Sequence, residues 1–187
     1  MRNGTNLLIL FIITINGCAG ILDPKEPQHG QNLITNSTFE LFGLPSLAGW
    51  TSTDNSVVLF SKDIQPGGSG WSIILHIRQG PAPLGLYNSI YTPITTGSGT
   101  HRCRLTFFGK MKGEGGGNVF LYYHRPGTEN AVLIDFIYVV DTGWARYSRT
   151  DTVTTIQQDT LFVMITGGSC ECSGTSYINT CKFEELD

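Results

Sequence analysis

Alternating hydrophobic and polar residues predict β-strands along nearly all of the chain after residue 31. No segment there keeps apolar residues at helical spacing for three turns without a Gly or Pro, whereas alternation over four to eight residues indicates a half-buried strand. The predicted strands are 57–61, 71–79, 102–112, 118–124, 131–140, 145–150, 160–166 and 176–184. Loops rich in Gly and Pro separate them. The predicted fold class is therefore all-β, as a two-sheet antiparallel β-sandwich in one domain.

Alternation also separates the expected core from the surface, because successive strand residues point to opposite faces of a sheet. In the second strand the inward residues are expected to be Trp71, Ile73, Leu75 and Ile77. In the third they are Cys103, Leu105, Phe107, Gly109 and Met111, which leaves Arg104, Thr106, Phe108 and Lys110 outside. In 118–124 both sets are apolar, so the inward one stays open. The run Gly113–Gly117 has no helix after it and is expected to be a hairpin connection.

The N-terminus has the parts of a secretion signal: a basic start at Arg2 and an apolar run over Leu7–Ile15. Nine residues at about 1.5 Å each are too short to cross a hydrocarbon layer of about 30 Å. The sequence Ile15-Asn16-Gly17-Cys18 resembles a bacterial lipobox. That resemblance implies a signal peptide over 1–17 and a lipid anchor on Cys18. Pro24, Pro27 and Gly30, with few apolar residues around them, predict a tether over 18–31, which leaves 32–187 as the folded domain.

This leader also sets the expected location. Ala19 rather than Asp follows the cysteine, which resembles lipoproteins sorted to the outer membrane or cell surface. The alternative is an ordinary secretion signal that is cleaved near Ala19-Gly20.

The charge balance argues against nucleic acid as a partner. The chain has 12 Lys and Arg against 15 Asp and Glu, a formal charge of −3, and removing Arg2 with the leader makes it more negative. We therefore expect no basic surface that could neutralise a phosphate backbone.

Five cysteines need partners in an oxidising compartment. If Cys18 carries lipid, an even number remains, with three possible pairings: Cys103, Cys170, Cys172 and Cys181. Cys170 and Cys172 are too close in sequence to favour bonding each other, so we expect each to bridge to Cys103 or Cys181. A metal site on Cys170-Glu171-Cys172 is the alternative, but its spacing differs from the usual C-x2-C.

Five segments in order resemble one known family. The segment from Asn32 to Glu40, followed by Gly49-Trp50, resembles the opening "N-L-(I/L)-x-N-G-x-F-E … G-W" of the carbohydrate-binding modules of xylanases and endoglucanases. The other four are 70–75, 104–110, 144–148 and 177–183, which resemble "G-x-x-S-L-x-L", "Y-x-L-S-F-x-A-K", "W-x-x-Y-S" and "Y-I-D-D-V-x-L". The resemblance implies a galactose-binding-like jelly roll that binds polysaccharide and has no catalytic activity.

The same resemblance implies a structural Ca²⁺ in many members, held near the opening Glu and the closing Asp together with backbone carbonyls. The matching positions are Glu40 and Asn179, and the second closing acid is Thr180 here. The site would therefore carry less negative charge and bind the ion more weakly. The alternative is that Glu40 is a paired surface carboxylate.

A sugar presents C–H groups on its faces and hydroxyls around its rim, so a binding site needs aromatic plates and a few polar groups. The candidates are Arg78, Tyr122, His76, Phe108, His124, Trp144 and Tyr147. Arg78 and Tyr122 are the preferred ones, although a ring in a strand also serves as core or as a cross-strand pair. No motif of a common hydrolase or nucleotide-binding site is present. Asp135 is the acid inside a strongly apolar strand: either an acid with a raised pKa, or a residue facing solvent or a cross-strand partner.

Three functional hypotheses follow. The first is a lipid-anchored, non-catalytic module that holds polysaccharide at the cell surface for enzymes made elsewhere. The second is a surface adhesion or structural lipoprotein that uses the same fold for protein contacts and has no sugar site. The third is a secreted eukaryotic protein that is glycosylated at the sequon Asn36-Ser37-Thr38. The first requires a ring-bearing outer groove that is separate from the hydrophobic interior.

Overall fold

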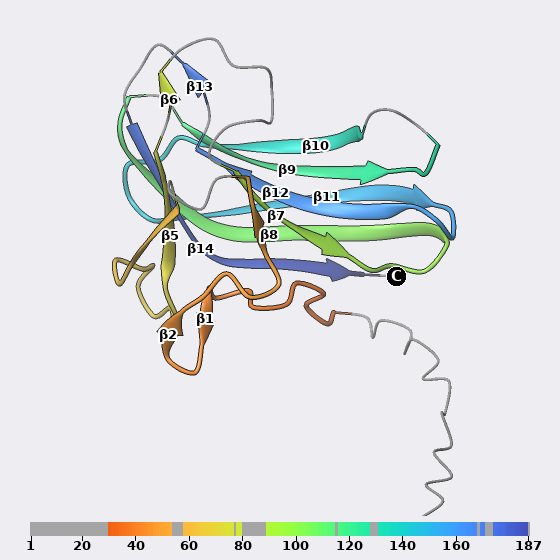
Figure 1. The fold of residues 1–187 in the computed structure, drawn as a ribbon, viewed down its shortest axis with the longest axis horizontal. Coiled ribbons are helices and arrows are strands. Elements are labelled where there is room, and N and C mark those ends of the chain that lie inside the picture. The colour runs from red at the N-terminus through yellow and green to blue at the C-terminus, as the bar shows by residue number, and fades with distance from the viewer. Residues whose placement is uncertain are drawn as a thin grey trace, which may run out of the picture.

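The fold is a sandwich of two antiparallel sheets (Figure 1). The computed structural model describes residues 30–53, 58–76, 78–79, 89–114, 116–127, 131–167, 169–170 and 174–186. The strands there are β1 (Glu40–Leu41), β2 (Leu44–Pro45), β3 (Thr51–Ser52), β4 (Val58–Ser61), β5 (Ser72–His76), β6 (Arg78–Gln79), β7 (Ser89–Ile94), β8 (Gly99–Gly113), β9 (Gly117–His124), β10 (Val132–Val139), β11 (Ala145–Thr155), β12 (Thr160–Thr166), β13 (Ser169–Cys170) and β14 (Gly174–Glu185).

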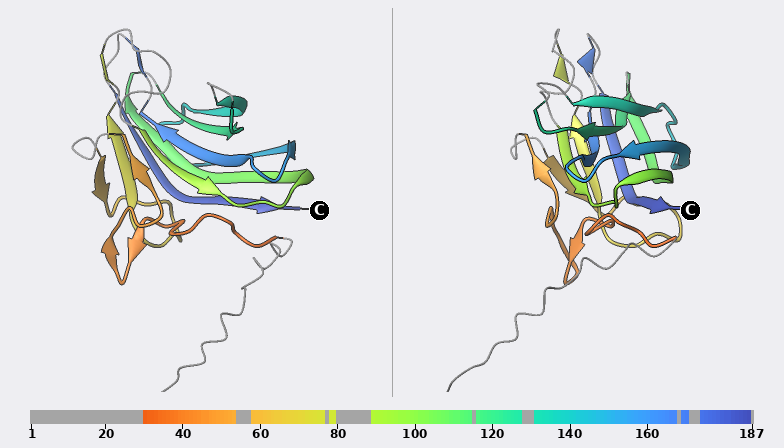
Figure 2. Two further views of the ribbon diagram at one scale, coloured as in Figure 1. Left: turned by 45° about the vertical axis from the view of Figure 1, so that its right-hand side comes forward. Right: turned by 90° about the vertical axis from the view of Figure 1, so that its right-hand side faces the viewer.

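Ten of these strands form two five-stranded sheets that pack face to face (Figure 2). The first sheet has the order β11-β8-β14-β5-β4, and the second has the order β10-β9-β12-β7-β3. Two small sheets, β1-β2 and the parallel pair β13-β6, complete the fold. The predicted all-β sandwich is confirmed. No helix in the described ranges is long and apolar enough to cross a bilayer.

The core lies between the two sheets, where strand alternation placed it. Leu105 and Phe107 of β8 are buried, and Phe183 of β14 is fully buried beside them. In β9 the register settles what alternation left open, because Val119 and Leu121 point inward. Phe120 and Tyr122 consequently belong to the outer face of the second sheet.

Trp71 departs from the predicted pattern. It precedes β5 and is half-buried, with the ammonium of Lys62 3.9 Å from the centroid of its ring. The prediction that it faces the core is wrong, because the strand starts one residue later. Ile77 lies outside the described residues.

The glycine-rich run after β8 is a second correction. β8 pairs with β11 and β14, whereas β9 pairs with β10 and β12. The run Gly113–Gly117 therefore carries the chain from the first sheet to the second and is not a hairpin. β8 and β9 follow each other in the sequence but belong to different sheets, because each pairs with strands from distant parts of the chain.

Strand β7 was missing from the prediction. It pairs with β12 on one side and with β3 on the other. It contains Pro93, which cannot donate a ladder hydrogen bond and argues against an interior strand. Pro93 lies exposed on the outer face of the sheet.

The expected disulfides to Cys103 and Cys181 are also wrong. Both are free thiols in the core, and burial raises the pKa of Cys103 to about 12 and also raises that of Cys181. Cys103 pairs with Glu185 at the end of β14 that is remote from Gly174. Eleven residues of strand, about 36 Å, separate Gly174 from Glu185, while bridged Cα atoms lie within about 7 Å. Cys172 and the side chain of Cys170 lie outside the described residues.

Candidate functional site

The predicted sugar-binding residues do not come together on one face. Tyr122 and His124 lie on the outer face of the second sheet, as their register against Phe162 and Thr160 shows. Phe108 and His76 lie on the outer face of the first sheet, on the opposite side of the sandwich. His76 is exposed, and its Nδ1 contacts Thr175 Oγ1 at 3.1 Å. For Arg78 the backbone is placed in β6, and the side chain lies outside the described residues.

The outer face of the second sheet carries a row of aromatic side chains, which we call the ring row. Its members are Tyr91 of β7, Phe162 of β12, Tyr122 and Phe120 of β9, and Phe136 and Tyr138 of β10. The distances between ring centroids are 6.0 Å for Tyr91–Phe162, 5.6 Å for Phe120–Tyr122, 6.1 Å for Phe120–Phe136 and 5.0 Å for Phe136–Tyr138. Phe162 and Tyr122 are register partners and join the two parts. The row thus crosses four neighbouring strands.

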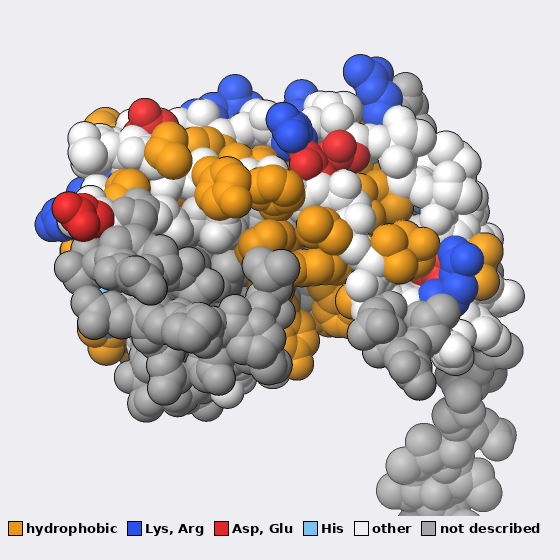
Figure 3. Space-filling model, turned by 90° about the horizontal axis from the view of Figure 1, so that it is seen from above, with side chains coloured by type: hydrophobic (Ala, Val, Ile, Leu, Met, Phe, Trp, Pro, Cys, Tyr) orange, Lys and Arg blue, Asp and Glu red, His pale blue; other side chains and the backbone are white. Residues whose placement is uncertain are grey.

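Five of the six rings of the ring row are accessible. Phe136 is 39% exposed and Tyr138 57% exposed, while Tyr122, Phe162 and Tyr91 are half-buried. Phe120 is covered by its neighbours. In Figure 3 hydrophobic side chains gather in the view from above, the side on which β10 lies. Partial burial raises the pKa of the Tyr122 hydroxyl, which keeps it a neutral hydrogen-bonding group.

Polar groups border the ring row. His124 is half-buried beside Thr160, and Asn118 lies between Tyr138 and Thr166 in the register. The Oδ1 atom of Asn118 is buried and has no hydrogen-bond partner in the structure. Rings flanked by amide, imidazole and hydroxyl groups match what a sugar requires, namely a flat apolar plate with polar groups at its margin.

Trp144 belongs to the other face. Its Nε1 donates to Asp63 Oδ1 at 3.1 Å, and the ammonium of Lys110 lies 4.9 Å from the centroid of its ring. Lys110 also donates to Asp63, and this hydrogen bond is the main reason that the pKa of Asp63 is lowered. These contacts hold Trp144 on the outer face of the first sheet, away from the ring row.

Tyr147 has a structural position. Its ring stacks on that of Phe107 at 5.1 Å in the core. Its hydroxyl donates to Asp141 Oδ2 at 2.6 Å and accepts hydrogen bonds from the backbone N–H groups of Val140 and Asp141. The predicted rim position is therefore replaced by a role in fixing the β10–β11 connection.

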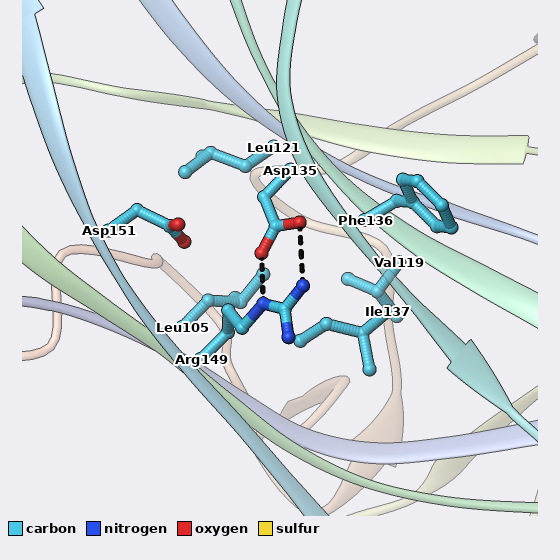
Figure 4. A pocket seen from close by; sticks show the side chains of 8 residues that line it. All are labelled: Leu105, Val119, Leu121, Asp135, Phe136, Ile137, Arg149 and Asp151. Carbon is cyan, nitrogen blue, oxygen red and sulfur yellow. Dashed lines mark hydrogen bonds and ion pairs between the residues drawn. The ribbon is translucent and has the colours of Figure 1, made fainter.

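Asp135 occupies a cavity between the two sheets, at the edge formed by β10 and β11 (Figure 4). It accepts hydrogen bonds from Nε and Nη2 of Arg149, which lower its pKa, so of the two alternatives for Asp135 the acid with a raised pKa is wrong. Burial, followed by the Asp135 charge, instead raises the pKa of Asp151. The cavity has about 0 Å³ of room even for a water-sized molecule, so it is no pocket for a small ligand, which needs roughly 300 Å³.

The two residues expected to hold calcium lie where the opening and closing segments meet. Asn179 is fully buried; its Nδ2 donates to the carbonyls of Ser69 at 3.2 Å and Trp71 at 2.8 Å. Its Oδ1 accepts from Thr180 Oγ1 at 2.9 Å. Glu40 is half-buried in β1. The amide hydrogens of Asn179 face oxygens that a cation would need, so this side chain does not fit a calcium ligand.

Other potential metal ligands are dispersed. Among the residues that the structure describes, no three His, Cys, Asp or Glu side chains gather as a metal site. Asn36, the sequon asparagine, is engaged as well: its Nδ2 donates to Ser46 O at 2.9 Å and its Oδ1 accepts from the Glu40 N–H at 2.7 Å. Both side-chain ends of Asn36 therefore stabilise the opening segment.

Comparison with solved structures shows the fold class. The second carbohydrate-binding module of family 16 matches with a TM-score of 0.58 at 17% identity, covering 81% of this chain and 99% of the module. The tandem CBM22-1–CBM22-2 domain of Xyn10C from Paenibacillus barcinonensis gives 0.55 at 12% identity, covering 86% of this chain and 46% of the other. The enzymatically active domain of bacteriophage CBA120 tailspike protein 4 gives 0.57 at 16% identity, covering 83% of this chain and 21% of that one.

The chain therefore has the β-sandwich jelly-roll fold that carbohydrate-binding modules use. At these identities the likeness shows the fold and not the ligand. No protein-family model and no curated protein matches the chain.

Most of the ring row escaped the sequence analysis. Phe162 sits in a predicted strand whose alternation, Phe162 and Met164 against Leu161 and Val163, was a usable signal. Tyr91 was lost with β7, and Phe136 and Tyr138 lie in a strand that is apolar at nearly every position. The register shift between Leu133 and Asp135 decides that Phe136 and Tyr138 lie on the same face as Tyr122.

Proposed function

We propose that this chain is a non-catalytic glycan-binding domain and that the ring row is its binding surface. The observation that carries the proposal is the line of rings across β7, β12, β9 and β10, all of them partly exposed except Phe120, bordered by His124 and Asn118. Buried aromatic area gives a sugar face its contact, and partly exposed polar groups orient the rim hydroxyls. The fold shared with carbohydrate-binding modules supports the same function.

Truncating a central ring is expected to abolish most of this binding. Tyr122→Ala and Phe162→Ala should each weaken retention by about tenfold, which corresponds to about 1.4 kcal/mol. Phe108→Ala is the matched control, since its half-buried ring lies on the opposite outer face. The measurement is retention on insoluble glycans and affinity electrophoresis with soluble neutral plant, algal and host glycans.

Two outcomes would contradict the proposal. One is no retention on any glycan of the panel, which favours the adhesion alternative, for which exposed Leu133 beside the ring row supplies apolar contact surface. The other is an equal loss for Phe108→Ala, which moves the site to the first sheet.

We further propose that the domain is exported and anchored through lipid on Cys18, so that it holds polysaccharide at the cell surface, near surface enzymes. The support is the leader pattern in the sequence. Mass measurement of the mature protein is expected to give a chain that begins at acylated Cys18. A chain that begins at Ile21 or later would rule out the anchor.

A further inference from the structure

The hairpin of β1 and β2 ends in an apolar tip that no other part of the domain covers. Leu41 and Leu44 are register partners, so their side chains lie on the same face, and Phe42 and Gly43 form the two-residue turn between them. Phe42 is 95% exposed, the highest value among the exposed large hydrophobic side chains of the described residues, and Leu44 is 68% exposed. We call residues 41–44 the hairpin tip. It projects from the sandwich in every view of Figures 1 and 2.

The backbone at Phe42 is unusual for an aromatic residue. Its φ is 52°, and that of Gly43 is 80°. Positive φ at both central residues defines a type I′ turn, whose first position favours Asn, Asp or Gly. A bulky side chain is disfavoured in this left-handed region, and a ring in water gains no packing in return. Local strain of this kind is typical of functional positions, so the ring of Phe42 is suited to a contact outside the domain.

A tryptophan and a lysine border the hairpin tip. Trp71 Nε1 donates to the carbonyl of Gly43 at 3.4 Å, and the ammonium of Lys62 lies 3.9 Å from the centroid of the Trp71 ring. Glu40 is half-buried, and alternation places it on the face of the hairpin opposite Leu41. Tryptophan is enriched where an apolar layer meets water, and a lysine beside it is attracted to anionic lipid headgroups. An apolar tip with this border matches the surface of a lipid bilayer.

Other occupants fit the hairpin tip less well. It offers three apolar side chains, of which the aromatic one has an area of about 150–250 Å². That is too little for a stable protein interface, in which each partner buries roughly 800 Å². A sugar would need a flat plate with polar groups at its margin, whereas the hairpin tip itself has no polar side chain.

We propose that the hairpin tip inserts into the surface of a lipid bilayer and so orients the domain on the membrane. The location rests on the proposed lipid anchor, because the roughly 12 residues from Cys18 to Gly30 span at most about 40 Å and keep an anchored domain near the bilayer. Figures 1 and 2 place the hairpin and β10 at opposite ends of the molecule. An inserted tip therefore leaves Phe136 and Tyr138 of the ring row clear of the bilayer.

The test is co-sedimentation with vesicles of the chain over 19–187, which contains every residue that the structure describes and lacks the acyl anchor. Binding is expected at about millimolar lipid. Phe42→Asn should weaken it by about tenfold or more, because the most exposed apolar group is lost. Its Tm should stay the same or rise, since asparagine tolerates positive φ, so unfolding cannot explain the loss.

Lys62→Gln tests the contribution of the headgroups. It should weaken binding to vesicles of phosphatidylethanolamine and phosphatidylglycerol by about fivefold, because one cation near an anionic surface is removed. Binding to vesicles of phosphatidylcholine alone should stay nearly unchanged, since that surface carries no net charge.

Ile156→Asn is the matched control for Phe42→Asn. Ile156 is 48% exposed in the connection between β11 and β12, which lies far from the hairpin in Figures 1 and 2. This variant should bind vesicles as the natural chain does. The proposal is overturned if the natural chain binds neither kind of vesicle or if Phe42→Asn and Ile156→Asn lose equally. Self-association without vesicles that Phe42→Asn abolishes would also overturn it and assign the hairpin tip to a second copy. Because the tested chain carries no lipid and Phe42→Asn should keep glycan retention, a failure here leaves the proposed anchor and the ring row intact.

Discussion

Replacing Asn179 with Ala is expected to lower the free energy of unfolding by about 3 kcal/mol, since each buried polar group left without its partner costs about 1–3 kcal/mol. The substitution removes the donor to the carbonyls of Ser69 and Trp71 and the acceptor for Thr180 Oγ1. For a domain of about 150 residues this corresponds to a fall of about 10 °C in Tm. Urea unfolding and a thermal melt measure it.

Asn118→Ala is the control, because the Oδ1 of Asn118 lacks a partner and its side chain is half-buried. Asn118→Ala should lower the free energy of unfolding by well under half as much as Asn179→Ala does. Similar losses for the two variants would show that Asn179 does not join the segments in this way.

Asn179 also determines whether the natural chain is expected to bind Ca²⁺. The side-chain amide of Asn179 already donates hydrogen bonds to the two carbonyl oxygens that an ion would otherwise bind. Ca²⁺ is therefore expected to leave the Tm of the natural chain unchanged. In Asn179→Asp, the carboxylate would face two carbonyl oxygens; Ca²⁺ that binds only the folded form should raise its Tm. A rise for the natural chain that chelation reverses would restore the calcium expectation.

Gly70→Ala is expected to destabilise the fold by about 4 kcal/mol, near the top of the range for single substitutions. Gly70 has φ +75°, and an added Cβ would lie 2.3 Å from the carbonyl oxygen of Thr38. That oxygen also accepts the hydrogen bond from the N–H of Trp71 at 3.0 Å. The backbone of the opening segment would have to shift, because no side-chain rotation relieves the contact.

Gly67→Ala separates the two causes. Gly67 has φ +73°, but no atom lies within 4 Å of its added Cβ. It should therefore cost only the conformational penalty, about 1–2 kcal/mol. If urea unfolding gave equal losses for the two variants, the close approach at Thr38 would carry no energy.

The contacts around Asn179 and Gly70 explain what the family-like segments do. The opening, Gly70–Trp71 and closing segments meet through the N–H groups of Trp71 and Cys181, which donate to the carbonyls of Thr38 and Ser37. Their sequence pattern encodes how the sandwich is tied together, so it predicted the fold and said little about a ligand.

The candidate sites were harder to predict, for a reason that β7 and β10 illustrate. A residue's face follows from local alternation, but the neighbour across the strand follows from pairing between segments far apart in the chain. Tyr91 and Phe162 touch although 71 positions separate them. Likewise, Arg146 lies beside Phe108 only through the β11–β8 register.

The sequence by itself determined the all-β class, the inner residues of β5 and β8 and the outward direction of Phe108 and Lys110, because side-chain alternation is a local property of a strand. Only the tertiary structure decided that Tyr122 and Phe108 lie on opposite sides, that β8 and β9 belong to different sheets, and that six rings gather on one face. Those outcomes depend on long-range hydrogen bonding between strands, which no single segment encodes.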